Sequence, residues 1–111
     1  MVARHWVQSI EWTAHKPIAL DAGLDPSIVD SIEQGETPEF ENEDEEIVYL
    51  VADEICGTRQ LSEATYDRAV TMFGEKSFFE LTAVIGYYTN IAIQLNCFAV
   101  AAPGADELFK S

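Results

Sequence analysis

The sequence predicts an all-α fold. Apolar residues recur at the three- and four-residue spacing of helices, and capping residues and glycines mark successive ends. No run of alternating apolar and polar residues indicates a strand, and no glycine-rich phosphate loop is present. A chain of 111 residues with 48% hydrophobic content can fill one modest core. We therefore expect a single helical domain over residues 1–111, with about five helices.

The first predicted helix runs from about Ala3 to Ala22 and stops at Gly23. Its apolar positions are Val7, Ile10, Ala14, Ile18 and Ala19. Pro17 lacks an N–H and clashes with the carbonyl four residues earlier, so it is expected to bend this helix.

Two helices are predicted in the middle of the chain. Asp25 is an N-cap followed by a first-turn proline, and the helix that it opens stops at Gly35. Asn42 is a second cap, three residues before Glu45, and opens a helix that ends at Gly57. The acidic run over residues 41–46 lacks the glycine and the alternation of a calcium loop, which favours a solvated helix start.

Two further helices complete the prediction. Ser62 caps a helix that ends at Gly74. Ser77 and Glu80 then form the capping box S-x-x-E, which opens a long apolar helix from Phe78 to about Ala101.

The last predicted helix raises the question of a membrane span, because residues 81–105, up to Asp106, carry no charge. Asn90, Gln94 and Asn96 interrupt it, so a buried helix is the better interpretation. In a monomer of this size, a helix that is apolar on every side is buried only if the other four helices surround it completely. We expect a homo-oligomer, a dimer, trimer or hexamer, with a central helix in a monomer as the alternative. The aromatic residues expected to divide between core and interface are Phe78, Phe79, Tyr87, Tyr88 and Phe98.

Charge and cysteine content exclude several functions. Twenty acidic residues against six basic ones give a net charge of -14, which repels nucleic acid and anionic lipid surfaces. Cys56 and Cys97 form no C-x-x-C pair and lie in apolar surroundings, which indicates buried free thiols. The start of the chain has no signal-peptide pattern, so we expect a cytoplasmic protein that binds neither nucleic acid nor membrane.

A polar stripe on the first helix is the candidate site. Gln8, Glu11, Trp12 and His15 follow one another at spacings that place them along one side of a helix, with Arg4 one turn earlier. Spacing alone favours a solvent-exposed Glu11–His15 pair of little energetic weight. The neighbouring tryptophan suits instead a pocket wall, where the carboxylate would orient the imidazole as a general acid or base.

Metal and thiol chemistry are less well supported. His5 and His15 are ten positions apart, about 15 Å along a helix, so they cannot bind one ion. Glu11 and His15 have no evident third ligand, and neither cysteine has a basic neighbour. We expect no metal and no cofactor.

The same residues resemble a known family, the carboxymuconolactone decarboxylase-like group of the alkylhydroperoxidase-D superfamily. The resemblance covers nearly the whole chain and rests on several segments. These are E-W-T-A-H-K-P-I-A-L-D-A-G-L from Glu11, L-S-E-A-T-Y from Leu61, F-G-E from Phe73, E-L-T-A-V-I-G-Y-Y from Glu80, and residues 96–103. It implies an alkylhydroperoxidase-D-like, oligomeric helical bundle.

The chain departs from the family where redox chemistry would occur. Peroxidatic relatives carry C-x-x-C-x-x-x-H before an A-G-L stop, and alignment on Ala22 to Leu24 places the histidine at His15 and the cysteines at Gln8 and Glu11. A residual peroxide or thiol oxidoreductase is therefore disfavoured, because both thiols are replaced. The resemblance also implies that the family's N-terminal helices, with an upstream glutamate, have no counterpart here.

A cofactor-free decarboxylase of a small carboxylated lactone remains the leading hypothesis that the resemblance implies. His15 would be the proton donor, Glu11 its orienting partner, Gln8 a hydrogen-bond donor and Arg4 a carboxylate clamp. Trp12, Tyr87 and Tyr88 would line the pocket. The alternative is a non-catalytic oligomerising helical domain.

Overall fold

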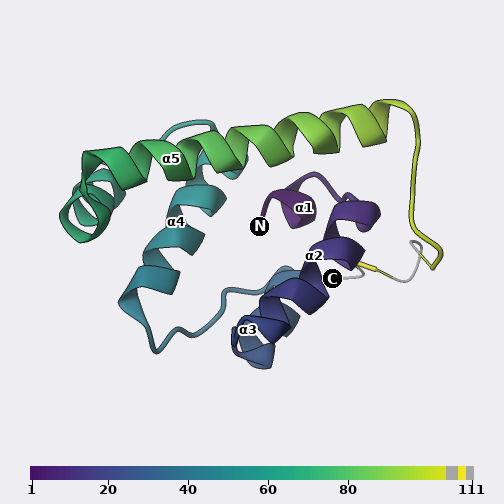
Figure 1. The fold of residues 1–111 in the computed structure, drawn as a ribbon, viewed down its shortest axis with the longest axis horizontal. Helices are drawn as coiled ribbons and strands as arrows, with labels where there is room; N and C mark the ends of the chain where they lie inside the picture. The colour runs from purple at the N-terminus through teal and green to yellow at the C-terminus, as the bar shows by residue number, and fades with distance from the viewer. Residues whose placement is uncertain (105–107, 110–111) are drawn as a thin grey trace.

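The computed structural model of the protein describes residues 1–104, 108 and 109. These residues form five helices and no strand, which confirms the all-α prediction. The helices are α1 (Val2–His5), α2 (Ser9–Asp21), α3 (Pro26–Gln34), α4 (Glu43–Thr58) and α5 (Glu63–Cys97). In Figure 1, α5 lies along one long side of the molecule, and α4, α1 and the α2–α3 pair lie below it.

The single helix predicted over residues 3–22 is wrong, because the structure breaks it in two. Val7 adopts a left-handed conformation with φ 51°, and Gln8 is extended. The Gln8 side chain then accepts a hydrogen bond from the Ile10 N–H, which starts a new helix. α2 continues past Pro17 as far as Asp21.

The next two helices begin where the sequence predicted. Asp25 caps α3 by accepting from the Ser27 N–H, and Gly35 ends it in the left-handed conformation. α4 starts after Asn42, although that side chain makes no capping bond. The predicted end at Gly57 is wrong, since the helix runs to Thr58 and Arg59 takes the left-handed terminal position.

α5 consists of two helical parts divided at Gly74, where the sequence predicted a helix end. Gly74 has φ 79° and ψ 164°, which is not a helical conformation, and the chain is helical on both sides of it. The second part follows Gly74 directly instead of starting at Ser77, and it ends at Cys97 instead of near Ala101. Figure 1 shows the two parts of α5 pointing in different directions.

The hydrophobic core lies between α4 and α5. Its buried members are Ile47, Val51 and Ala52 on α4 and Ala69 and Ile85 on α5. α1 packs against both of these helices, and α2 contacts α1 and α3. This arrangement leaves the start of α2 beside the core.

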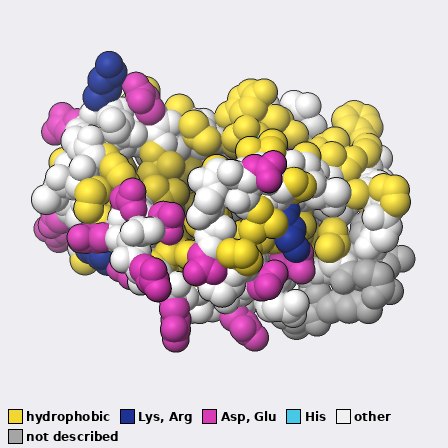
Figure 2. Space-filling model, turned by 60° about the horizontal axis from the view of Figure 1, so that its bottom comes forward, with side chains coloured by type: hydrophobic (Ala, Val, Ile, Leu, Met, Phe, Trp, Pro, Cys, Tyr) yellow, Lys and Arg dark blue, Asp and Glu magenta, His cyan; other side chains and the backbone are white. Residues whose placement is uncertain are grey.

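The aromatic residues predicted to divide between core and interface differ in exposure on the single chain. Phe78 and Tyr88 are half-buried, whereas Phe79, Tyr87 and Phe98 are 72%, 61% and 81% exposed. Figure 2 shows hydrophobic side chains at the surface, with acidic side chains gathered over another part of the same face. Within the described part of the chain, no helix has both the length and the apolarity to cross a membrane.

Candidate functional site

A pocket of about 490 Å³ opens between α2 and the faces of α3, α4 and α5, and the first three residues of the chain also line it. Most of its lining side chains are apolar. Four residues of the predicted site line it: Glu11, Trp12 and His15 on α2, and Tyr88 on α5. The structure thus brings together residues separated by more than 70 positions in the sequence.

Glu11 is the most unusual group in this pocket. Its side chain belongs to the first turn of α2 and is only 4% exposed. The buried Oε1 atom has no hydrogen-bond partner. Burial raises the pKa of this carboxyl above its ordinary value, and the nearby His15 and the N-terminal amino group oppose that rise. Glu11 therefore keeps its proton up to a higher pH than a surface glutamate does.

His15 is oriented by the backbone. Its Nδ1 lies 2.8 Å from the carbonyl oxygen of Glu11. Because a carbonyl can only accept, Nδ1 must carry the hydrogen, which leaves Nε2 available for proton transfer. The His15 and Tyr88 rings pack edge to face, with their centroids 4.9 Å apart. The sequence suggested that the Glu11 carboxylate would orient the imidazole, whereas the hydrogen bond comes from the Glu11 main chain.

Trp12 and Lys16 are anchored to the neighbouring helix. The Trp12 indole N–H donates to Glu33 Oε1 at 2.7 Å, and the Lys16 ammonium donates to the same oxygen at 3.1 Å. This shared carboxylate on α3 holds the indole as a wall of the pocket. It also offsets much of the positive charge of Lys16.

Gln8 does not line the pocket. Its side chain is 2% exposed, and its amide donates to Asn96 Oδ1 at 2.8 Å and to the Val100 carbonyl at 3.2 Å. Asn96 in turn donates to the Trp6 carbonyl at 2.7 Å. Gln8 therefore joins the start of α2 to the end of α5.

Arg4 and Tyr87 also lie apart from Glu11 and His15. Arg4 lines a second, smaller pocket of about 230 Å³, where His5 Nε2 lies 2.9 Å from Asp53 Oδ1. The Arg4 guanidinium lies over the ring of Phe109, 5.0 Å from its centroid. Tyr87 is exposed and meets the pocket only through ring contact with Tyr88, at 5.2 Å between centroids.

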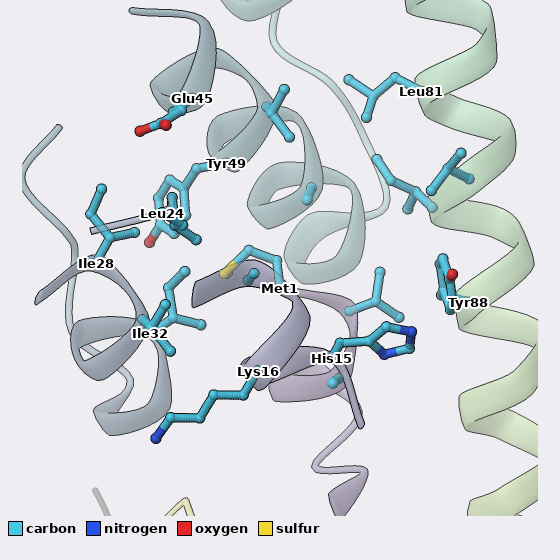
Figure 3. Close-up of a pocket in the computed structure, with 18 of the residues that line it drawn as sticks. Met1, His15, Lys16, Leu24, Ile28, Ile32, Glu45, Tyr49, Leu81 and Tyr88 are labelled. Atoms are coloured by element: carbon cyan, nitrogen blue, oxygen red, sulfur yellow. The ribbon is translucent and has the colours of Figure 1, made fainter. Parts of the chain in front are cut away.

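The lining residues on α4 were not predicted from the sequence. Asp44, Glu45 and Tyr49 line the pocket. The acidic run is nevertheless a solvated helix start, as predicted, because residues 41–44 are exposed and Glu45 and Glu46 are partly exposed at the first turn of α4. Figure 3 shows Glu45 and Tyr49 on one side of the pocket and His15 beside Tyr88 on the other. The signal that could have found them is the register of α4, since positions 45, 48, 49 and 52 share one helical face.

The described residues contain no group of three or more histidine, cysteine or acidic side chains that could hold a metal ion. Both cysteines are free. The prediction that both are buried is wrong for Cys97, which is exposed near the end of α5, while Cys56 is partly buried on α4.

Comparison of the chain with models of protein families, with curated proteins and with solved structures finds no match.

Proposed function

We propose that this protein is a carboxymuconolactone decarboxylase-like enzyme that binds a small carboxylated lactone in the pocket beside α2. The observation that carries the proposal is the Glu11 carboxyl, which is nine-tenths buried, has an unpartnered oxygen and shares the pocket with His15. An unpartnered buried acid is costly unless it serves a ligand or a reaction. The apolar remainder of the lining suits the carbon skeleton of a lactone.

The reaction needs no bound cofactor in this proposal. The bond between the lactone and its carboxylate breaks, carbon dioxide leaves, and the electron pair passes into the conjugated ring carbonyl. A proton then adds to the carbon skeleton to give the product. Glu11 supplies this proton, because burial favours its protonated form. His15, with its exposed side chain and free Nε2, returns a proton from solvent to Glu11.

The test is decarboxylation of carboxymuconolactone, followed by the release of carbon dioxide. Glu11→Gln and His15→Asn should each lower kcat by about a hundredfold or more, the usual contribution of an acid–base group. Asparagine at position 15 can still donate to the Glu11 carbonyl, so this substitution removes Nε2 while preserving the local bond. His5→Asn and Glu75→Gln are the matched controls, since neither residue lines the pocket. Equal rates in all five proteins would contradict the proposal.

A homo-oligomer is part of the proposal, and the exposed aromatic residues of α5 support it. Phe79 and Tyr87 are the most exposed of these within the helix. The surface between residues 81 and 98 carries no charge, so two chains of net charge -14 can approach there with the least repulsion. The same feature favours the second candidate function, a non-catalytic oligomerising domain.

Light scattering at several protein concentrations tests the assembly. Replacing both Phe79 and Tyr87 with serine should lower the measured mass toward that of one 12.3 kDa chain. The control replaces Tyr66 and Met72, which are exposed on the other part of α5, and should leave the mass unchanged. A wild-type protein that stays at 12.3 kDa would contradict the homo-oligomer. Assembly without turnover of carboxymuconolactone would favour the second candidate.

A further inference from the structure

The charges lining the pocket are unevenly placed, and this asymmetry bears on the substrate. We infer that the substrate carries a single carboxylate, and that a neutral hydrogen-bond donor, such as an amide or hydroxyl, occupies its other end and faces Asp44 and Glu45. The inference rests on the proposed function, because it names the substrate class of the same pocket. It departs from a dicarboxylate such as carboxymuconolactone itself.

The acidic and basic groups of the lining lie on different parts of the chain. Asp44 and Glu45 line the pocket on α4, whereas Glu11, whose protonated form burial favours, lies on α2. The basic groups of the lining are His15, the Met1 amino group and Lys16, and the Lys16 ammonium is already bonded to Glu33 at 3.1 Å. None of these basic groups is on α4, so a second substrate carboxylate at that end would meet two like charges.

Basic and acidic side chains of the pocket lining also lie on different helices. His15 and Lys16 belong to α2, whereas Asp44 and Glu45 belong to the first turn of α4. Figure 3 shows Glu45 on the opposite side of the pocket from His15. A carboxylate beside the α2 basic groups leaves the far end of a lactone next to the α4 acids. There, a donor gains hydrogen bonds and a carboxylate is repelled.

The α4 side of the pocket combines carboxylates with an aromatic wall. Asp44 Oδ1 accepts from the N–H of the adjacent Glu45 at 2.8 Å, at the exposed first turn of α4. The rings of Tyr49 and Phe40 pack 5.3 Å apart and both line the pocket. The buried, unpartnered Oε1 of Glu11 is a separate sign that the pocket receives a hydrogen-bond donor.

The experiment compares two ligands of nearly equal size. One is carboxymuconolactone, with two carboxylates, and the other is its analogue with the side-chain carboxylate replaced by a primary carboxamide. Calorimetry on His15→Asn measures both affinities without turnover. The carboxamide should bind about tenfold more tightly or better, as expected for removing one charge near two carboxylates. This preference should shrink as salt is added.

Two double variants test whether Asp44 and Glu45 cause the preference for the carboxamide. Asp44→Asn combined with Glu45→Gln should reduce the preference to about twofold or less, because it removes both opposing charges. Glu63→Gln combined with Asp67→Asn makes the same change of net charge on exposed residues outside the pocket, and should leave the preference intact. A preference that survives the first double variant would overturn the assignment to Asp44 and Glu45.

The outcomes separate this inference from the proposed function. Equal or tighter binding of the dicarboxylate overturns the inference, while turnover of carboxymuconolactone by the wild-type protein would still support the decarboxylase. Preference for the carboxamide without turnover of either compound supports the charge selectivity and contradicts the decarboxylase. Binding of neither compound at millimolar concentration overturns both.

Discussion

The Nδ1 atom of His15 lies 2.8 Å from the backbone carbonyl oxygen of Glu11, one turn earlier in α2. His5 has the opposite arrangement, because its Nε2 lies 2.9 Å from Asp53 Oδ1. Carbonyl and carboxylate oxygens both accept hydrogen bonds, so each contact fixes a different ring nitrogen as the donor. The two histidines of this chain are therefore held in different tautomers.

Nitrogen-15 NMR of the imidazole rings should detect this difference. In the neutral state, His15 should carry its hydrogen on Nδ1 and His5 on Nε2. His5→Asn and His15→Asn, each leaving one histidine, assign the two sets of signals. The same tautomer mixture at both positions would show that these contacts do not persist in solution.

Replacing Glu11 with glutamine should change how stability depends on pH. Because burial raises the pKa of Glu11, the folded state holds this proton at pH values where the unfolded state has released it. The contribution of this bound proton to the free energy of unfolding is complete below the ordinary glutamate pKa. It is lost as pH rises through the pKa that Glu11 has in the folded state. At neutral pH, Glu11→Gln should therefore be more stable than the wild type by roughly 1 kcal/mol.

Urea unfolding of both proteins from pH 4 to pH 8 measures this effect. The difference between their free energies of unfolding should widen as the pH rises. Groups common to both proteins cancel in the comparison. Among them is Glu54, whose pKa is lowered mainly by its hydrogen bond from Thr65. Glu75→Gln, at an exposed position, should show no such widening. Parallel curves for wild type and Glu11→Gln would mean that the carboxyl is hydrated in solution.

That Glu11 and His15 share one face of α2 could be predicted from spacing, but the side chains of α4 that line the same pocket could not. A helical stripe specifies which residues share a face, and it contains no information on which other helix covers that face. Gln8 illustrates a second limit. Its position on the stripe was predicted, yet capping placed it at the break before α2, where its amide bonds to Asn96 instead of facing the pocket.

Helix ends were predictable where a side chain or glycine acts locally. The cap at Asp25 and the left-handed Gly35 are of this kind, and both are observed. The break at Val7 has no such signal, because a β-branched residue with positive φ is unfavourable on its own. The next residue, Gln8, makes the long-range hydrogen bonds at this break, to Asn96 and Val100. The helix end predicted at Gly74 is also observed, as a break in the helical backbone between the two parts of α5.

Gly74 and Gly86 provide a matched test of this kink. Both lie on α5, and a Cβ atom added to either would meet no neighbour within 4 Å. Gly74 has φ 79° and ψ 164°, a conformation that alanine adopts only with strain of roughly 1–3 kcal/mol. Gly86 is an ordinary helical position, where alanine should stabilise by roughly 0.5–1 kcal/mol.

Thermal unfolding of Gly74→Ala and Gly86→Ala should therefore show changes of opposite sign. The pair controls for composition and exposure, because the substitution is the same and both sites are exposed. A stabilised Gly74→Ala protein would indicate that α5 straightens through residue 74 and that the kink is not maintained in solution.

The two cysteines should differ in reactivity toward an alkylating reagent. Cys97 is exposed, whereas Cys56 is partly buried, and burial together with the nearby Asp53 raises the pKa of its thiol, against an opposing effect of the N-terminal amino group. Since the thiolate is the reacting species, iodoacetamide near pH 8 should modify Cys97 roughly tenfold faster or more. Peptide mass spectrometry over time measures both rates, and Cys97→Ser isolates the slower site. In urea the two rates should converge, because unfolding removes the burial of Cys56. Equal rates in the native protein would instead show that the packing of α4 around Cys56 opens readily to solvent.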